Sequence, residues 1–115
     1  MLLFVSRTTL KKDTHMRWIE ILQIKSYSEQ DRDNALKLLR EIAVIGADIP
    51  KKIELLTCQN LPTDIGVCLY WDKESRDSIK SDLAEKLNAA LKYFGWISHT
   101  IWDPVKEELS CQPKK

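Results

Sequence analysis

The sequence contains no pair of closely spaced cysteines. Its three cysteines, Cys58, Cys68 and Cys111, lie far apart and form no C-x-x-C motif. An odd number at this spacing argues against a disulfide framework and against a zinc site, so we expect neither a metal nor another cofactor. Free thiols are typical of proteins in a reducing cytoplasm, and a cytoplasmic location is therefore expected.

The sequence also lacks a long apolar run and an excess of charge of one sign. The apolar start, residues 2–5, is shorter than the ~7–15 apolar residues of a signal peptide. No stretch approaches the ~18 apolar residues of a membrane span. Lysine and arginine total 18, and aspartate and glutamate total 17. Because dedicated nucleic-acid-binding domains are usually strongly basic, we expect neither nucleic acid nor a membrane among the partners.

What the chain does contain is typical of one soluble globular domain: 115 residues, 43% hydrophobic and 30% charged. Residues 1–15 show no clear hydrophobic period, and Met16 directly precedes the first good strand. The first 15 residues are therefore either an N-terminal extension or the product of an upstream start codon. The predicted division is an extension at 1–15, an α+β domain at 16–103 and a solvated tail at 104–115.

Four segments have the alternation or the short apolar run that is typical of β-strands. In the first segment, Trp18, Leu22 and Ile24 share one face with Glu20, because successive side chains point to opposite faces of a strand. The third segment is apolar on both faces. The predicted strands are residues 17–25, 52–59, 65–71 and 96–102.

Two segments have the hydrophobic period of helices. The first is expected to begin after Ser28, with Asp31 three residues on as in a capping box, and to end at Gly46. The second is expected to begin somewhere in residues 72–78, where several residues could cap it, and to run to Phe94.

The order β-α-β-β-α-β predicts an α+β, ferredoxin-like fold. We expect a four-stranded antiparallel sheet with both helices on one face, except that the central strands, 17–25 and 65–71, are expected to run parallel. Two short helices cover one face only, yet the first three strands carry apolar residues on both faces. Since soluble monomers rarely expose a large apolar patch, another copy, a partner or a ligand should cover the second face. Two copies packed sheet to sheet would form a homodimer with a closed barrel.

Three segments resemble the dimeric α+β barrel superfamily, in particular proteins similar to antibiotic-biosynthesis monooxygenases. They are Arg17–Leu22, Gly66–Trp71 and Phe94–His99. The resemblance covers about residues 16–103 and implies a dimeric barrel with a pocket inside the barrel or between the helices and the sheet. The group includes cofactor-free oxygenases, haem-degrading enzymes and members of unknown activity. The haem-degrading branch needs a histidine on its second helix, and residues 78–94 contain none.

Glu20 and His99 are the candidate catalytic residues. His99 is the only histidine within the domain pattern and could act as a general acid or base near neutral pH. Its position places it with Ile97 and Ile101, on the side expected to face the helices. Glu20 could be a base with a raised pKa that abstracts a proton from a phenol or an activated carbon in a pocket. The alternatives are a structural, hydrogen-bonded histidine and an ordinary solvent-facing or salt-bridged carboxylate.

Trp18, Tyr70, Trp71 and Trp102 are the candidate ligand-binding residues. Their rings could stack on a planar ligand or fill the interior of a barrel. The alternative is that they are aromatic residues of the core or of a dimer interface, where tryptophan and tyrosine are common. Cys68 is interpreted as a small buried hydrophobic residue, since a nucleophilic thiol would need a base beside it.

Two classes of function remain open. The first is a homodimer that binds a small aromatic or apolar ligand without chemistry. The second is a cofactor-free monooxygenase or an isomerase-like enzyme acting on an aromatic or polyketide-like substrate. Polar groups converging in a pocket would favour the enzyme, and a pocket filled by tryptophan and leucine would favour the binding protein. Binding of single-stranded RNA on the free face is disfavoured, because residues 66–70 contain no lysine or arginine.

Overall fold

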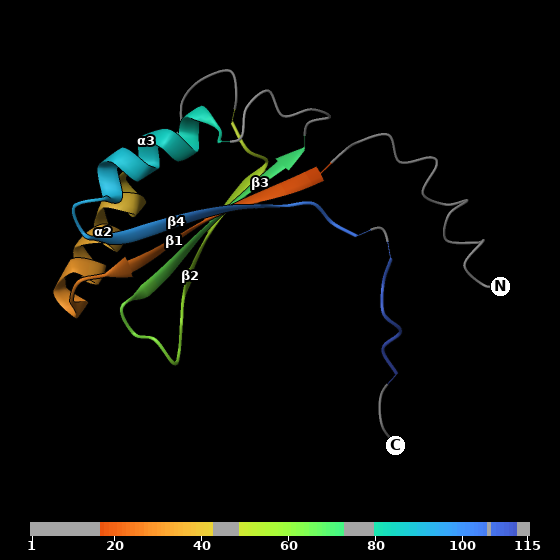
Figure 1. Cartoon of the computed structure of the whole chain (residues 1–115), viewed down its shortest axis with the longest axis horizontal. Helices are drawn as coiled ribbons and strands as arrows, with labels where there is room; N and C mark the ends of the chain where they lie inside the picture. The colour runs from red at the N-terminus through yellow and green to blue at the C-terminus, as the bar shows by residue number, and fades with distance from the viewer. Residues whose placement is uncertain (1–16, 43–48, 73–79, 106, 113–115) are drawn as a thin grey trace.

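The computed structural model describes residues 17–42, 49–72, 80–105 and 107–112. The elements occur in the predicted order (Figure 1). They are β1 (Arg17–Ser26), α2 (Glu29–Glu41), β2 (Lys52–Thr57), β3 (Asp64–Asp72), α3 (Asp82–Leu91) and β4 (Gly95–Trp102). Each strand boundary lies within two residues of its prediction. The N-terminal extension predicted at 1–15 lies outside the described residues.

The four strands form one antiparallel sheet in the order β2-β3-β1-β4. The predicted α+β class and antiparallel sheet are confirmed, and the layout is consistent with a ferredoxin-like fold. The prediction that the central strands β1 and β3 run parallel is wrong: they pair antiparallel from Arg17 opposite Asp72 to Lys25 opposite Asp64. The crossover through α2 makes β2 parallel to β1, and the β2-β3 hairpin then reverses the direction of β3.

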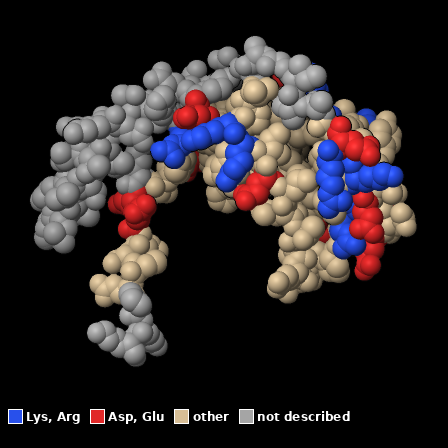
Figure 2. Space-filling view, turned by 180° about the vertical axis from the view of Figure 1, so that it is seen from behind, with Lys and Arg blue, Asp and Glu red and all other residues tan. Residues whose placement is uncertain are grey.

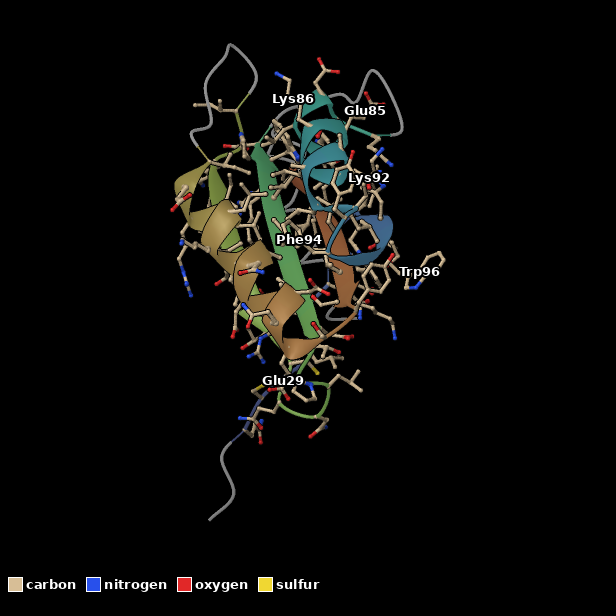
Figure 3. The ribbon with its side chains drawn as sticks, turned by 90° about the vertical axis from the view of Figure 1, so that its left-hand side faces the viewer. Glu29, Glu85, Lys86, Lys92, Phe94 and Trp96 are labelled. Carbon is tan, nitrogen blue, oxygen red and sulfur yellow. The ribbon has the colours of Figure 1, made fainter. Side chains whose placement is uncertain are left out.

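Both helices lie over the same face of the sheet, as expected (Figures 1 and 3). Side chains at alternate positions of β1 and β3 point into the core below the helices, where they meet buried residues of α3. Phe94, at the end of the α3 segment, packs against this core between the two helices (Figure 3). The fully buried side chains include Leu22, Ile24, Leu69 and Leu91. The alternation in the sequence therefore grouped the covered side chains of β1 correctly.

The first helix begins as predicted and ends earlier. The Ser28 hydroxyl accepts a hydrogen bond from the Asp31 amide at 3.0 Å, as an N-cap residue does. The backbone leaves the helix at Ile42, where φ is −72° and ψ is 127°. The predicted end at Gly46 is therefore wrong, and Gly46 itself lies outside the described residues.

The second helix begins later than predicted. Its N-cap is Ser81, whose hydroxyl accepts from the Ala84 amide at 3.0 Å, so a start in residues 72–78 is wrong. Asp82 and Glu85 lie in its first turn, where acidic side chains favour a helix N-terminus. Regular helix ends at Leu91, and a turn joining the Phe94 amide to the Leu91 carbonyl at 2.9 Å leads into β4.

The surface mixes charges of both signs. Figure 2 shows lysine and arginine side chains next to aspartate and glutamate, with uncharged surface between them. After β4, the described part of the C-terminal segment forms no helix or strand and extends away from the sheet (Figure 1). None of the helices within the described ranges is long and apolar enough to span a bilayer.

Candidate functional site

Glu20 is the most unusual side chain of the core, because it is a carboxylate with no solvent exposure. It lies on β1, on the face covered by the helices, between the apolar positions Trp18 and Leu22. A buried charge is costly unless hydrogen bonds satisfy it. Four donors, drawn from three other parts of the fold, do so here.

The four donors come from β3, β4 and the start of α3. The indole Nε1 of Trp71 donates to Glu20 Oε1 at 2.8 Å, and the hydroxyl of Ser81 donates to the same oxygen at 2.6 Å. The backbone amide of Ser81 donates to Oε2 at 2.9 Å. His99 Nε2 lies 2.8 Å from Oε2 and forms a salt bridge with Glu20 when the imidazole is protonated. Each carboxylate oxygen therefore has two partners.

These contacts decide the ionisation of Glu20. Burial by itself raises the pKa of a carboxyl group, but the hydrogen bonds from Ser81, His99 and Trp71 outweigh it and lower the pKa of Glu20 below its usual value. The amide of Ser81 also places the carboxylate at the positive end of α3. Glu20 is therefore held as an anion, and the prediction that it serves as a raised-pKa base does not fit this environment.

Ser81 is the member of the site that the sequence prediction missed. It caps α3 and anchors Glu20 with both its amide and its hydroxyl. The signal was present in the sequence, since Ser81 is followed by Asp82 and, at the fourth position, Glu85. An N-cap serine with acidic residues in the next turn is a standard helix start, but residues 72–78 offered competing caps.

His99 lies on the edge strand β4, opposite Leu22 of β1. As its spacing predicted, it faces the helices. Because a carboxylate only accepts hydrogen bonds, Nε2 carries the hydrogen of this contact and Nδ1 holds a lone pair in the neutral ring. Within the described ranges Nδ1 has no hydrogen-bond partner. The side chain is 11% exposed whereas Glu20 is 0% exposed, so His99 is the member of the pair that reaches the surface.

The predicted ligand-binding residues divide between the two faces of the sheet. Trp18 and Trp71, on paired positions of β1 and β3, stack in the core with ring centroids 5.4 Å apart and planes inclined by 17°. They are 5% and 3% exposed, and they lie beside Glu20. The structure thus brings these two tryptophans together with both catalytic candidates.

Tyr70 and Trp102 lie on the opposite, uncovered face. Both pair with Ile19 of β1, one from β3 and one from β4. The Tyr70 hydroxyl donates to Glu54 at 2.7 Å, and this contact, together with burial, raises the pKa of Tyr70. The structure therefore separates these two rings from the Glu20–His99 pair.

Cys68 is on the uncovered face of β3 and is 4% exposed. Burial raises the pKa of its thiol, and the charge of Glu54 raises it further. A thiol that resists ionisation is a poor nucleophile. This agrees with its interpretation as a small apolar residue.

Within the described ranges, no three histidine, cysteine or acidic side chains are grouped closely enough to hold a metal ion. Comparison of the chain with protein-family models, with curated proteins and with solved structures found no match. The function is therefore argued from the geometry of this site alone.

Proposed function

We propose that this protein binds a small aromatic or apolar molecule at His99 and transfers a proton to or from it. The observation that supports the proposal is the hydrogen bond between His99 Nε2 and the fully buried, anionic Glu20. A buried carboxylate that fixes one imidazole nitrogen leaves the other nitrogen as the reacting atom, which is the logic of many general-base dyads. Here the reacting atom is Nδ1.

Glu20 and His99 have different roles in the proton transfer. Neutral His99 accepts a proton at Nδ1, and the resulting imidazolium is stabilised by the Glu20 carboxylate 2.8 Å from Nε2. Glu20 stays ionised because Ser81 and Trp71 donate to it as well. In this mechanism His99 is the catalytic residue, and Glu20 is a positioning residue that sets its tautomer and orientation.

The residues beside His99 indicate what kind of molecule could approach it. Ile97 and Ile101 flank it on the same side of β4 and are partly buried against the core. Their exposed parts provide apolar surface on both sides of the imidazole. Such surroundings favour an aromatic or aliphatic molecule with a weakly acidic C–H or O–H group over a highly charged one.

The test uses an aromatic carbon acid that reports proton abstraction directly, 5-nitrobenzisoxazole. A base removes its ring C–H proton, the N–O bond breaks, and the coloured cyanophenolate forms. We expect the protein to accelerate this reaction by about a hundredfold over free imidazole at equal concentration, the lower end of what a positioned base contributes. His99→Ala should abolish the acceleration.

Glu54→Gln is the matched control for this experiment. Glu54 is a carboxylate on β2 whose hydrogen bond goes to Tyr70 on the uncovered face, so the acceleration should survive its replacement. A rate that is the same in the native protein and in His99→Ala would remove the proton-transfer proposal. Saturable binding of the probe without turnover would instead favour a ligand-binding protein without chemistry.

We further propose that a second copy of the chain packs on part of the uncovered face. Tyr70, Ile19 and Trp102 form one row across β3, β1 and β4. Trp102 is 57% exposed. A row of aromatic and aliphatic side chains on an open sheet is typical of a protein interface. Sheet-to-sheet packing of two copies would bury this row in a homodimer.

The dimer can be tested with Trp102→Asp. Because Trp102 is largely exposed, its replacement should leave the folded chain intact, and a charge within the interface should weaken association by about 2 kcal/mol or more. Sedimentation equilibrium at micromolar concentration should then show a dimer for the native protein and a monomer for the variant. Tyr93→Asp is the control, since Tyr93 is 73% exposed and lies between α3 and β4, outside the sheet. A monomeric native protein would contradict the proposal.

A further inference from the structure

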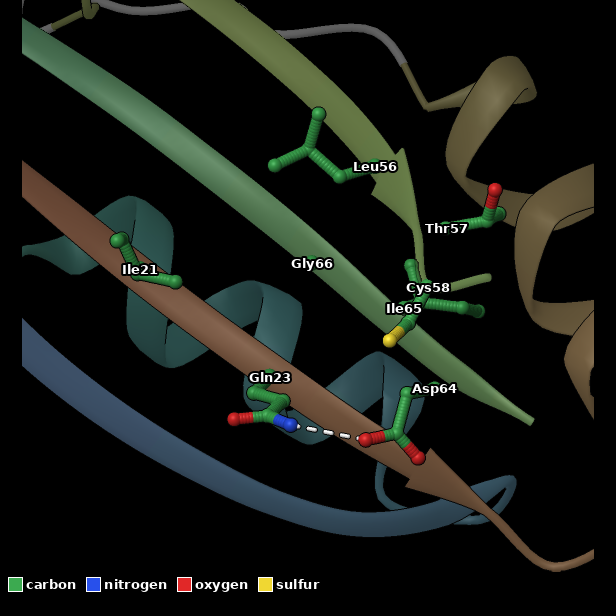
Figure 4. A pocket seen from close by; sticks show the side chains of 8 residues that line it. All are labelled: Ile21, Gln23, Leu56, Thr57, Cys58, Asp64, Ile65 and Gly66. Atoms are coloured by element: carbon green, nitrogen blue, oxygen red, sulfur yellow. Dashed lines mark hydrogen bonds between the residues drawn. The ribbon is translucent and has the colours of Figure 1, made fainter. Parts of the chain in front are cut away.

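The uncovered face of the sheet has a hollow at the end far from Tyr70. Its volume is about 190 Å³, and it lies over β1, β2 and β3. Ile21 and Leu56 provide apolar walls, and Gln23 and Asp64 provide polar groups (Figure 4). This volume is about six times the share of one water molecule in the liquid, and a cavity of similar size is enough for a single aromatic ring.

Gly66 explains why the sheet is hollowed at this point. It pairs with Gln23 on one side and with Leu56 on the other, so the row across the three strands has no side chain at its centre (Figure 4). A Cβ atom at Gly66 would lie 3.5 Å from Leu56 Cβ, an ordinary van der Waals contact. The backbone therefore tolerates a side chain here, and the absence of one leaves the space open.

The polar side chains of the hollow leave two hydrogen-bond acceptors unused. The Gln23 amide nitrogen donates to Asp64 Oδ2 at 2.9 Å (Figure 4). This contact uses a donor of Gln23 and leaves its Oε1, together with Asp64 Oδ1, without a hydrogen-bond partner in the described part of the chain. Asp64 is 5% exposed and lines the hollow, and its unused oxygen is not fully buried. This oxygen can accept a hydrogen bond from a ligand, and a cationic donor forms the stronger bond.

The nearest cationic side chain does not fill this role. Lys25 pairs with Asp64 across the strands, but the structure shows no salt bridge between these two described side chains. Lys25 is exposed and hydrated, and a charge in water interacts weakly. The Asp64 carboxylate is therefore available to a ligand.

We propose that this hollow binds a small primary amine that carries an apolar ring, with the ammonium group on Asp64 and Gln23 Oε1 and the ring against Ile21 and Leu56. The site is separate from the Glu20–His99 pair, which lies on the other face. It is also distinct from the Tyr70 row: Tyr70 lies four positions after Gly66 on β3, which is about 13 Å along a strand. The two faces of the sheet then serve different ligands.

Phenethylamine is the probe, with phenylpropionate and phenylethanol as its anionic and neutral counterparts. We expect phenethylamine to shift the backbone amide signal of Gly66 and the side-chain amide signals of Gln23 in NMR titrations. The expected dissociation constant is on the order of 1–10 mM, as for a ligand of this size. Asp64→Asn keeps the shape of the side chain and removes its charge, so binding should weaken at least about tenfold. Phenylpropionate should not bind in the hollow.

Gly66→Val is the second variant, because it fills the space without altering Asp64. It should abolish binding while the amide spectrum stays dispersed as in a folded protein. Three outcomes would overturn the proposal: no shift of these signals with the native protein, equal binding of phenylpropionate or phenylethanol, or unchanged affinity in Gly66→Val. Gly66→Val therefore still tests the proposal if Asp64→Asn does not fold.

Discussion

Replacing Glu20 with alanine is expected to lower the free energy of unfolding by about 3–5 kcal/mol, the usual cost of breaking a buried polar pair. Trp71 Nε1, both donors of Ser81 and His99 Nε2 would lose the acceptor that they share. A buried donor that loses its acceptor costs its full desolvation free energy. Urea denaturation at pH 7 measures the loss.

Glu54→Ala is the control, because it also removes a carboxylate charge but from a less buried position. Glu54 is a partly buried carboxylate on β2 with one side-chain hydrogen bond, from Tyr70, so its loss should cost only about 1 kcal/mol. Equal destabilisation by the two substitutions would mean that the four hydrogen bonds of Glu20 contribute no more to stability than the single, partly buried hydrogen bond of Glu54.

Comparison of the native protein with Glu20→Gln gives a pH dependence with a definite sign. The folded-state pKa of Glu20 is below its ordinary value of 4.5. Its stabilisation is therefore complete above pH 4.5 and is lost as the pH falls through the lower folded-state pKa. The difference in stability between the native protein and Glu20→Gln should narrow on acidification below pH 4.5. A difference that stays constant there would show that Glu20 is not held as an anion.

Gly95→Ala is expected to destabilise the protein by about 3 kcal/mol, the upper end of ordinary overpacking. Gly95 begins β4 and pairs with Ser26 of β1. A Cβ atom there would clash with the Lys25 carbonyl oxygen and would lie 2.7 Å from the Lys25 carbonyl carbon and from Ser26 Cα. All three are backbone atoms, so no side-chain rotation can relieve the clash, and β1 and β4 would have to separate locally.

Gly66→Ala is the matched control, since both glycines lie in paired strands. The new methyl group at Gly66 would meet only the Leu56 side chain, at ordinary contact distances of 3.5 and 3.8 Å. We expect a change within about 0.5 kcal/mol, as for a substitution without a strained contact. Thermal or urea unfolding of the two variants side by side tests the argument. Similar losses in both would refute the backbone clash at Gly95.

Alternation in the sequence grouped Glu20 with apolar residues of β1 and placed His99 on the side that faces the helices, but it did not decide which face of β1 is covered. Alternation alone decides only which residues share a face of a strand. The contact between the two side chains depends on the register of β1 against β4, where Glu20 is opposite Ile101 and Leu22 is opposite His99. Register is set by long-range pairing, so the spacing of residues in the sequence could not predict the 2.8 Å hydrogen bond.

The first residue of α3 was mispredicted for a different reason. Several serine and aspartate residues precede it, and each is a competent cap on local chemistry. The helix begins at Ser81, where its hydroxyl and amide also bind Glu20 of β1. The contact with Glu20 thus favours Ser81 over the other residues that could cap the helix. The hollow around Gly66 was missed for a related reason, because its three strands are neighbours only in the folded sheet.

The partners of Glu20 also bear on how the chain folds. Trp71, Ser81 and His99 follow it by 51, 61 and 79 residues, so closing these loops carries an entropy cost before any contact is made. Contacts at such separations slow folding and form late. Until β4 docks, Glu20 lacks its His99 partner and the core is incomplete. We therefore expect this carboxylate to become fully buried only when β4 docks.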